Sequence, residues 1–407
     1  MRPVSQTFPT ANQAPLDPEI SVVIPCLNEA DTLESCIQKA QAALAENRVE
    51  GEIILADNGS TDESRSIAAR LGVRVVEVAA RGYGNALMAG IAAARGKFII
   101  MGDADDSYDF REIPEFIERL RNGADLVQGC RLPSGGGSVS SGAMPFLHRW
   151  WGNPMFSFMA RRMFNAPVND VYCGMRGFTK DLYERLDQQC TGMEFASEMI
   201  VKASLRNARI VEVPITLHPA GRKSHAPHLK TFHDGWRTLR FFLMYSPRWL
   251  FLAPGVALVI FGLIGYALAM PAVTFRGATF DAHTLLFASL AILCGYQAIL
   301  FSIFSQTFAV MEGFLPESKW LSRFYRVVNL ERGLAISAVA LLVGLSLMGI
   351  AFNRWRLSNF GPLNYAHTMR LVVPGVTLAA LGFQTILSSF FVSIMGMSRK
   401  SVDRKFS

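Results

Sequence analysis

The chain has 407 residues, of which 50% are hydrophobic, and a formal net charge of +7 at pH 7. Its six cysteines show neither Cys-x-x-Cys spacing nor histidine partners at zinc-like intervals, which disfavours a zinc module and predicts reduced cysteines that serve mainly in packing. The basic residues gather beside long apolar segments, where anionic lipid head groups attract them. We therefore expect membrane lipids, and no nucleic acid, among the partners.

Residues 1–19 are polar and contain proline, without the apolar stretch of a signal peptide, and we expect a disordered tail there. Over residues 20–228, short β-branched runs alternate with helical patterns. This alternation predicts an α/β domain with a mainly parallel sheet, whose ligands gather at the carboxyl ends of the strands. The expected strands are Ile20–Ile24, Glu52–Ala56, Val73–Val78, Phe98–Met101, Leu126–Gly129 and Ile210–Val213.

Acidic residues follow the first two expected strands. Glu29 closes the segment that begins at Pro25, and Asp57 ends the second strand. Ser60 and Glu63 have the spacing of a capping box for the next helix. Each carboxylate alone is better explained as an ordinary turn residue, but acidic strand ends that converge on one edge favour hydrogen bonds to a ribose or a base.

A glycine-rich turn, Arg81-Gly82-Tyr83-Gly84-Asn85, precedes another expected helix. Gly82 and Gly84 would let the backbone approach a ligand closely, and Arg81 could face a phosphate. The turn is a weak signal by itself. Neither a Rossmann dinucleotide fingerprint nor a Walker A lysine motif is present in the sequence.

Two aspartates, Asp103 and Asp105, come directly after the expected strand Phe98–Met101. In an extended backbone both side chains leave from the same face. Magnesium or manganese is typically held by one or two carboxylates, with water and phosphate oxygens completing the shell, so the pair predicts a nucleotide-diphosphate site. On this stretch alone, a solvated turn that includes Asp106 has equal weight.

A juxtamembrane helix is expected over residues 229–248. Its apolar and basic residues recur at helical spacing on two faces, which predicts an interfacial amphipathic helix. Packing of the helix on the preceding domain is the alternative, and both can hold for different faces. The apolar face consists of Leu229, Phe232, Trp236, Leu239 and Leu243, and the other face of Lys230, His233, Arg237 and Arg240.

Residues 249–397 contain four apolar stretches, each near or above the roughly 20 residues that a helix needs to cross a bilayer. Almost no charge interrupts them, so transmembrane helices are favoured over buried core helices. The four expected spans are Trp249–Met270, Leu285–Val310, Leu334–Phe352 and Leu371–Met397.

Basic residues predict the orientation of these spans. They cluster before the first span, between the second and third, and in the basic tail 398–407, while the opposite loops carry fewer. The positive-inside rule places the three richer segments, and with them residues 20–228, in the cytoplasm. We therefore expect a multi-pass protein of the inner, cytoplasmic membrane.

At this point the residues resemble a known family. The order of motifs is similar to that of inverting family 2 glycosyltransferases of the GT-A fold, and most similar to the branch of dolichol-phosphate mannose synthases and polyprenyl-phosphate glycosyltransferases. The resemblance covers about residues 20–246 and is specific through the combination of its motifs. Those motifs are Val23-Ile24-Pro25 to Glu29, Asp57 to Asp62, Arg81 to Ala86, Asp103-Ala104-Asp105, Gly129-Cys130-Arg131, Asp170 to Phe178, Gly192 to Glu198 and Glu212 to Ile215.

The resemblance implies roles for individual residues. It implies catalytic roles for Asp103, Asp105 and Arg131, with Mg²⁺ or Mn²⁺ on the two aspartates and Arg131 on the acceptor phosphate. Arg149 is a second candidate for that phosphate, and Arg222 and Lys223, whose register is uncertain, for the diphosphate. The residues expected to bind the nucleotide sugar are Pro25, Glu29, Asp57, Arg81, Gly82, Asp103 and Ala104.

The chain also departs from the family pattern. Ser107 stands where a glutamine often assists the metal, so a third protein ligand is doubtful. The Gln-x-x-Arg-Trp motif of processive synthases is absent, since Phe146 takes the place of its glutamine before Arg149-Trp150. Processive synthesis is thereby disfavoured.

We expect a membrane enzyme that moves a hexose from a nucleotide sugar, UDP-glucose first and GDP-mannose after the UDP-hexoses, to polyprenyl phosphate. One alternative is a transferase for another lipid acceptor such as diacylglycerol or ceramide, which would need a general base. A second is a lipid-linked sugar flippase or scaffold with a degenerate transferase domain, against which the intact aspartates argue. The sequence leaves a homo-oligomer open.

Overall fold

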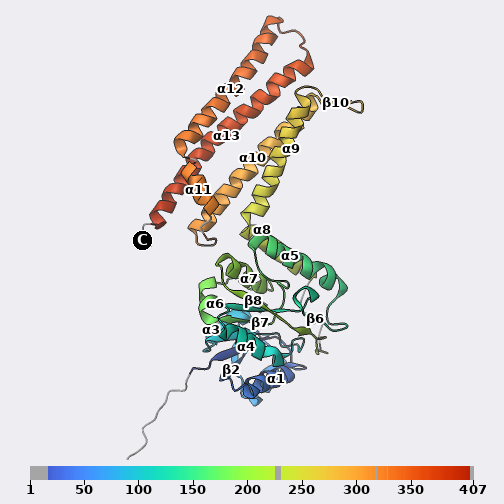
Figure 1. The fold of residues 1–407 in the computed structure, drawn as a ribbon, viewed down its shortest axis with the longest axis vertical. Coiled ribbons are helices and arrows are strands. Elements are labelled where there is room, and N and C mark those ends of the chain that lie inside the picture. The colour runs from blue at the N-terminus through green and yellow to red at the C-terminus, as the bar shows by residue number, and fades with distance from the viewer. Residues whose placement is uncertain (1–16, 225–230, 317–318, 328, 404–407) are drawn as a thin grey trace, which may run out of the picture. The chain divides into compact units, whose positions relative to one another are not determined.

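The structure is a computed structural model that describes residues 17–224, 231–316, 319–327 and 329–403. The chain divides into two compact units, Met1–Phe242 and Leu243–Ser407. The first holds a sheet with helices and the second holds long helices (Figure 1). The finer boundaries expected from the sequence stay predictions. Most of the expected N-terminal tail, His225, Leu229, Lys230 and the end of the basic tail lie outside the described residues.

A seven-stranded sheet with the order β3-β2-β1-β4-β7-β5-β8 forms the centre of the first unit. Its strands pair in parallel, except that β7 runs antiparallel to both β4 and β5. A second pairing joins β6 and β9. The strands are β1 (Ile20–Cys26), β2 (Gly51–Asp57), β3 (Arg74–Glu77), β4 (Phe98–Met101), β5 (Leu126–Cys130), β6 (Ser138–Val139), β7 (Arg176–Thr179), β8 (Ile210–Pro214) and β9 (Thr216–Leu217).

All six expected strands are present, so the predicted α/β fold is confirmed. The sequence does not predict β7, because its residues include a glycine and a fully buried arginine in place of a β-branched run. β1 lies between β2 and β4: the chain runs from β1 to β2 and β3 on one side and then crosses to β4 on the other side. In open α/β sheets, ligands bind beside the carboxyl ends of the strands at such a switch point.

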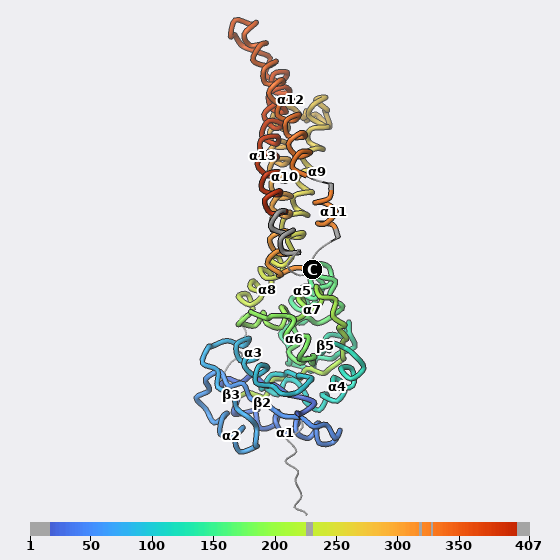
Figure 2. The backbone as a smooth tube through the Cα atoms, turned by 90° about the vertical axis from the view of Figure 1, so that its left-hand side faces the viewer, coloured from blue at the N-terminus to red at the C-terminus, as the bar shows by residue number. Residues whose placement is uncertain are grey.

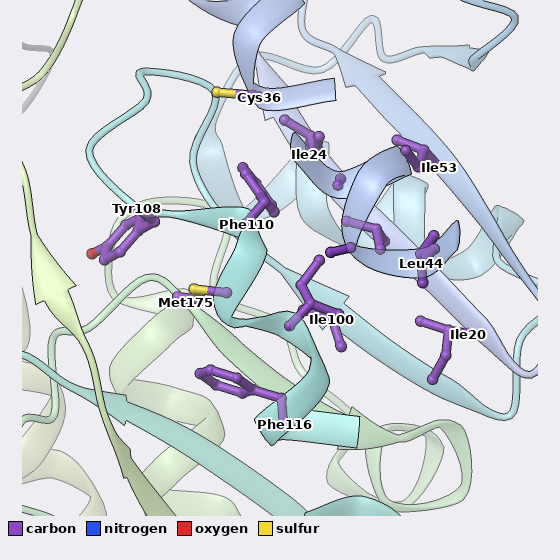
Figure 3. Close-up of a cluster of buried hydrophobic side chains, with 14 of the residues drawn as sticks. Ile20, Ile24, Cys36, Leu44, Ile53, Ile100, Tyr108, Phe110, Phe116 and Met175 are labelled. Carbon is purple, nitrogen blue, oxygen red and sulfur yellow. The ribbon is translucent and has the colours of Figure 1, made fainter. Parts of the chain in front are cut away.

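Helices cover both faces of the sheet. Alternate residues of β1, such as Ile20 and Ile24, belong to a buried cluster with side chains of α1 and α4 (Figure 3). Val23 points to the other face, where an added Cβ on Gly90 of α3 would lie 2.6 Å from its Cγ1. Burying one such aliphatic side chain stabilises the fold by roughly 1.5–3 kcal/mol. Tyr108 lies at the edge of the cluster with its hydroxyl directed away from it (Figure 3).

The helices of the first unit are mostly short and follow the strands in sequence. One of them differs from a simple α-helix, since a π-helical segment, η3 (His148–Gly152), leads directly into α5. The helices are α1 (Leu33–Glu46), α2 (Ser64–Arg70), α3 (Tyr83–Ala93), α4 (Ile113–Arg121), α5 (Asn153–Phe164), α6 (Lys180–Leu186), α7 (Phe195–Leu205) and α8 (Thr231–Tyr245), with 3₁₀ turns η1 (Phe110–Glu112) and η2 (Pro133–Gly135).

The expected capping box of α2 does not form. The helix begins at Ser64 without a side-chain cap. The Ser60 hydroxyl instead accepts a hydrogen bond from the Asn28 amide at 2.9 Å. A contact with the loop after β1 therefore replaces the local cap, and that expectation was wrong.

The expected juxtamembrane helix is present as α8, with two different faces. Phe242 is fully buried, and its ring centre lies 6.1 Å from that of Phe156 and 5.4 Å from that of Phe164, both on α5. Phe232 and Trp236, from the apolar stripe, are exposed. The helix thus packs on the domain through one face, while Phe232 and Trp236 lie outside that packing.

The second unit contains four helices that are long and apolar enough to cross a membrane, in agreement with the four expected spans. The first covers nearly the expected range, whereas the other three extend beyond their expected spans at both ends. Their bounds are α9 (Ala253–Ala269), preceded by the π-helical segment η4 (Arg248–Leu252), α10 (Ala282–Met311), α12 (Leu330–Leu357) and α13 (Tyr365–Asp403), with α11 (Lys319–Val327) and the hairpin β10 (Thr274–Phe275) and β11 (Ala278–Thr279) between them.

Glycines bring these helices together in pairs. An added Cβ on Gly255 of α9 would lie 2.9 Å from the carbonyl oxygen of Gly295 on α10. One on Gly344 of α12 would lie 2.6 Å from the carbonyl oxygen of Gly375 on α13. Small residues allow such close backbone approach between membrane helices. The unit therefore contains two helical hairpins, α9 with α10 and α12 with α13 (Figures 1 and 2).

Candidate active site

Asp103 and Asp105 follow β4 and are held by different partners. Asp103 Oδ1 accepts a hydrogen bond from the Tyr83 hydroxyl at 2.8 Å. Asp105 Oδ1 accepts one from the Ser107 hydroxyl at 2.5 Å, and its Oδ2 accepts one from Arg222 at 2.8 Å. Both carboxylates are therefore oriented at the carboxyl end of β4 before any ligand is considered.

Asp106 is not part of this pair. Its carboxylate forms an ion pair with Lys39 of α1 at 2.7 Å. Its backbone has a φ of 60°, in the left-handed region, which turns the chain after the pair. Both features expected from the sequence are therefore present in this segment: a turn at Asp106, and two oriented carboxylates before it.

The charge on Asp103 is unfavourable where it lies. Burial, and then the charge of Asp105, raise the pKa of Asp103 to about 6. A divalent cation between the two carboxylates would offset this cost, and two carboxylates with water and phosphate oxygens suit Mg²⁺ or Mn²⁺. No group of three or more His, Cys, Asp or Glu side chains with this capacity occurs among the described residues. Asp103 and Asp105 by themselves offer the carboxylate oxygens that such a cation uses.

Arg222 links the end of β1 to the end of β4. Its Nη2 lies 2.9 Å from Glu29 Oε1 and 2.8 Å from Asp105 Oδ2. Asp31 fixes the loop that carries it, since Asp31 Oδ2 accepts the backbone N–H of Lys223 at 2.9 Å. Of the two residues expected near the diphosphate, Arg222 contacts Asp105. The other, Lys223, is exposed.

Asp57 lies at the same edge, but its side chain is fully buried. Its Oδ2 pairs with Arg65 at 2.6 Å and its Oδ1 accepts the Ser60 N–H at 3.2 Å. These contacts explain Asp57 as an organiser of the loop after β2. The expected contact with a ribose or base requires Asp57 to exchange one of these partners, and it stays a prediction.

The glycine-rich turn packs against protein. An added Cβ on Gly82 would lie 2.4 Å from the Thr191 carbonyl oxygen, and one on Gly84 would lie 2.2 Å from the Cys190 carbonyl oxygen. The close approach that these glycines allow is therefore to residues 190–191. The turn starts α3 and so places Tyr83 against Asp103, while Arg81 is exposed.

Arg131 follows β5 and is tied to a buried carboxylate. Its Nε and Nη2 donate to Asp170 Oδ2 and Oδ1 at 2.7 and 2.8 Å. Its Nη1 lies 3.4 Å from the Tyr108 hydroxyl, which accepts the Gly174 N–H at 2.8 Å. A buried salt bridge to Asp170, which gives Arg131 a structural role, thus holds the guanidinium in a fixed plane.

The remaining expected site residues differ in accessibility. Pro25 and Ala104 are buried, and the Ala104 carbonyl accepts the Thr32 hydroxyl at 2.6 Å. Arg149 is half-buried over the Trp150 ring at 5.5 Å, and its buried Nε has no hydrogen-bond partner. Burial, and then the positive charge of Arg131, lower the pKa of the neighbouring His148.

Sequence reasoning did not assign roles to Tyr83, Tyr108 or Asp170, although each contacts an expected site residue. Asp170 and Tyr83 belong to the motifs that the chain shares with the family, and only this membership indicates that they are part of the site. Tyr108 carries no comparable signal, because an aromatic residue after a strand is usually a packing residue.

Comparison with known proteins gives two matches to family models. Residues 21–187 match "Glycosyl transferase family 2", and residues 303–396 match "Glycosyltransferase family 2 C-terminal transmembrane region". The two matched segments fall one in each compact unit.

Among curated proteins, the chain is 39% identical to the low-salt glycan biosynthesis hexosyltransferase Agl6 of Haloferax volcanii, over 93% of this chain and 89% of that protein. It is 29% identical to a dolichyl-phosphate hexose transferase of the same organism, over 48% of this chain and 82% of that protein. Among solved structures, glucosyl-3-phosphoglycerate synthase of Mycobacterium tuberculosis, in complex with Mn²⁺, UDP and phosphoglyceric acid, is 21% identical with a TM-score of 0.44 and covers 56% of this chain and 78% of that chain.

Proposed function

Because the chain belongs to glycosyltransferase family 2 and is a membrane glycosyltransferase of that family, we propose that it is a polyprenyl-phosphate glycosyltransferase. It moves a hexose from a nucleotide sugar to polyprenyl phosphate with inversion and supplies a lipid-linked sugar for modifying cell-envelope glycans. UDP-glucose is the first candidate donor, followed by UDP-galactose, other UDP-hexoses and GDP-mannose. The dolichyl-phosphate hexose transferase relative supports this acceptor class.

One observation carries the proposal. The oriented carboxylates of Asp103 and Asp105 and the guanidinium of Arg222 lie together at the end of β4, in a chain that also holds four candidate spans. Asp103 and Asp105 would hold a divalent cation, which acts as a Lewis acid on the diphosphate when bound. Arg222 lies on the same side and would pair with phosphate oxygens after leaving Asp105 or Glu29. This edge is therefore the donor side of the proposed site.

The proposed reaction needs little from a general base. An acceptor phosphate oxygen, already anionic at neutral pH, attacks the anomeric carbon and forms the new C–O bond. The bond from that carbon to the diphosphate oxygen breaks, and the diphosphate leaves with the electron pair. Positioning and charge neutralisation therefore supply most of the catalysis.

Arg131 would neutralise the acceptor phosphate. Asp170 binds Nε and Nη2, so the proposal assigns the phosphate contact to Nη1, whose contact with the Tyr108 hydroxyl is long, at 3.4 Å. Arg149, whose Nε has no hydrogen-bond partner, is the second acceptor candidate. A neutral hydroxyl acceptor such as diacylglycerol would need a general base near the acceptor oxygen. The residue proposed for that position, Arg131, is a cation.

The proposed enzyme keeps its catalytic unit in the cytoplasm, by the distribution of basic residues beside the spans. Arg370, one of the basic residues on the opposite side, forms an ion pair with Asp281 at 2.9 Å. That pairing reduces the positive charge which the outward loops present. It supports the expected orientation in the inner membrane.

Product analysis tests the proposal. Membranes that contain the protein are incubated with Mg²⁺, polyprenyl phosphate and each nucleotide sugar in turn, and the lipid product is identified by mass spectrometry. Membranes with the Asp105→Asn variant serve as the control. A hexosyl-phosphoryl-polyprenol with one donor is expected from the unmodified protein.

Parallel incubations with diacylglycerol and ceramide separate the acceptors. A glycosylated neutral lipid without a polyprenyl product would replace the proposal by its alternative. Absence of any lipid product from all donors would contradict an active transferase of this class and leave the flippase or scaffold alternative.

A further inference from the structure

Arg237 of α8 forms an ion pair with Glu194, in the segment of residues 190–194 that precedes α7. The Glu194 side chain is 12% exposed, and its Oε2 atom is buried without a hydrogen-bond partner among the described residues. The Arg237 guanidinium therefore compensates a carboxylate that has little access to water, and such a carboxylate is costly to leave unpaired. Neither residue has a role in the site described above.

The ion pair lies directly on the backbone of the 190–194 segment. An added Cβ on Gly192 would lie 2.7 Å from the carboxylate Oε2 and 2.8 Å from the guanidinium Nη2 of the pair. A second carboxylate, that of Glu198 on α7, fixes the start of the segment, since it accepts the N–H of Cys190 at 2.8 Å. The segment is thus held from both ends by charged side chains.

The same segment contacts the turn that begins α3. The Thr191 carbonyl oxygen accepts the Gly84 N–H at 2.9 Å. An added Cβ on Gly82 or Gly84 would lie 2.4 or 2.2 Å from carbonyl oxygens of the segment, so the two backbones touch. Between these glycines stands Tyr83, whose hydroxyl donates to Asp103 Oδ1 at 2.8 Å. Consecutive contacts therefore lead from α8, through the segment, to a carboxylate of the proposed metal site.

We propose that Arg237 is a positioning residue for the metal site. Its ion pair with Glu194 holds the 190–194 segment against the turn of α3, and the turn keeps the Tyr83 hydroxyl on Asp103. This role rests on the proposed function, in which Asp103 and Asp105 are the metal ligands. It gives the carboxylate pair a support that begins on α8.

The position of α8 in the chain gives this support a further consequence. α8 ends at Tyr245, and the first candidate span begins at Arg248. The helix that carries Arg237 is therefore the last helix before the chain enters the membrane. A displacement of α8 by the span would reach Asp103 through the contacts described above.

A purely structural ion pair is the competing explanation. Such a pair would stabilise the packing of α8, and its loss would lower the melting temperature without a specific effect at Asp103. Positioning is favoured because the contacts between the 190–194 segment and the turn are made by backbone atoms. In a close-packed interior, rotation of a side chain cannot absorb a shift of touching backbones. A shift of the segment therefore moves the turn.

Manganese binding tests the proposal without relying on turnover. The full chain is placed in phosphatidylcholine nanodiscs, and free Mn²⁺ is measured by electron paramagnetic resonance at one fixed pH. Arg237→Gln should weaken the Mn²⁺ affinity by roughly 2- to 30-fold, the range expected for substitutions within a coupled network. Arg240→Gln, at an exposed position of the same helix, is the matched control and should bind as the unmodified protein does.

Rescue and a double-mutant cycle exclude a purely structural effect. Combining Arg237→Glu with Glu194→Arg restores the pair with its charges exchanged and should recover most of the affinity that Arg237→Glu alone loses. In a Tyr83→Phe background, Arg237→Gln should cause little further loss, because the hydrogen bond through which it acts is already absent. An equal loss in both backgrounds, or no loss in either, would overturn the proposal.

Hydrogen exchange supplies a readout that needs no metal. The Gly84 amide, which donates to the Thr191 carbonyl, should exchange faster in Arg237→Gln than in Arg240→Gln, while the amides of β4 keep their rates. Unchanged exchange over residues 82–86 would contradict the proposal. Asp105→Asn tests the proposed function separately. If that variant binds Mn²⁺ as well as the unmodified protein, the metal assignment fails, and the exchange data still decide whether Arg237 positions the turn.

Discussion

Arg131 and Asp170 form a bidentate ion pair at the end of β5, with donor-to-acceptor distances of 2.7 and 2.8 Å. The Asp170 side chain is fully buried, so removing its partner would leave a charge without compensation. The same guanidinium that could meet the acceptor phosphate therefore also maintains the fold. Its two functions can be separated by experiment.

Arg131→Lys keeps the charge but loses the planar fork that Asp170 requires. We expect a lower melting temperature together with a higher KM for polyprenyl phosphate, because both contacts use the fork. Donor affinity, measured by calorimetry, should change little. Asp170→Asn is the control, since it weakens the ion pair and leaves the arginine. Loss of donor binding ahead of these effects would remove Arg131 from the acceptor side.

Asp105→Asn should leave the protein folded and membrane-inserted but lower turnover by about 100-fold or more, since a lost metal ligand removes several kcal/mol of charge stabilisation. Turnover is measured against the unmodified protein over a range of Mg²⁺ and Mn²⁺ concentrations. Asp106→Asn is the matched control, because Asp106 pairs with Lys39 instead. Near-normal activity of the Asp105 variant, or full activity in chelator, would contradict the metal assignment.

Tyr83→Phe removes the hydroxyl that donates to Asp103. Burial and Asp105 raise the pKa of Asp103 to about 6, and the Tyr83 hydrogen bond opposes that rise. Metal binding needs ionised Asp103, so activity at limiting metal should fall as the pH decreases through about 6. Without the hydroxyl this acid limb should move to higher pH, as pH profiles of kcat/KM would show. An unmoved limb would mean that Tyr83 does not act through Asp103.

Membrane topology is the fourth test. The charge distribution predicts that both termini and residues 312–332 face the cytoplasm, while residues 275–281 and 353–367 face outward. Single cysteines in a cysteine-free background are labelled from outside intact cells. Labelling within 312–332 from outside would overturn the four-span arrangement.

Much of the fold can be predicted from the sequence, because the spacing of apolar residues and the local composition indicate the strands and the membrane helices. The run Phe98–Met101 is buried on both faces, so it appears as a continuous apolar strand. β7 was not predicted because it contains a charged residue, Arg176. The Arg176 side chain is fully buried and donates hydrogen bonds to the carbonyl oxygens of Ala196 and Cys173. Only a tertiary environment that satisfies a guanidinium makes that strand possible.

The candidate site was less readable, because its contacts join residues far apart in sequence. The aspartates stand out by spacing alone, yet the partner of Asp103 is Tyr83, and that of Arg131 is Asp170. Gly82 and Gly84 show the same limit. Glycines signal close approach, but which backbone approaches depends on where the segment at Cys190 and Thr191 lies.

The glycine contacts of the second unit bear on how the protein is made. Gly255 meets Gly295 within the first hairpin, and Gly344 meets Gly375 within the second. Each seam joins helices that are neighbours in the chain, so neither hairpin needs residues of the other to close it. During synthesis the first hairpin can assemble in the membrane before the ribosome has completed the second. Because the catalytic unit precedes both, it emerges from the ribosome ahead of its own anchor.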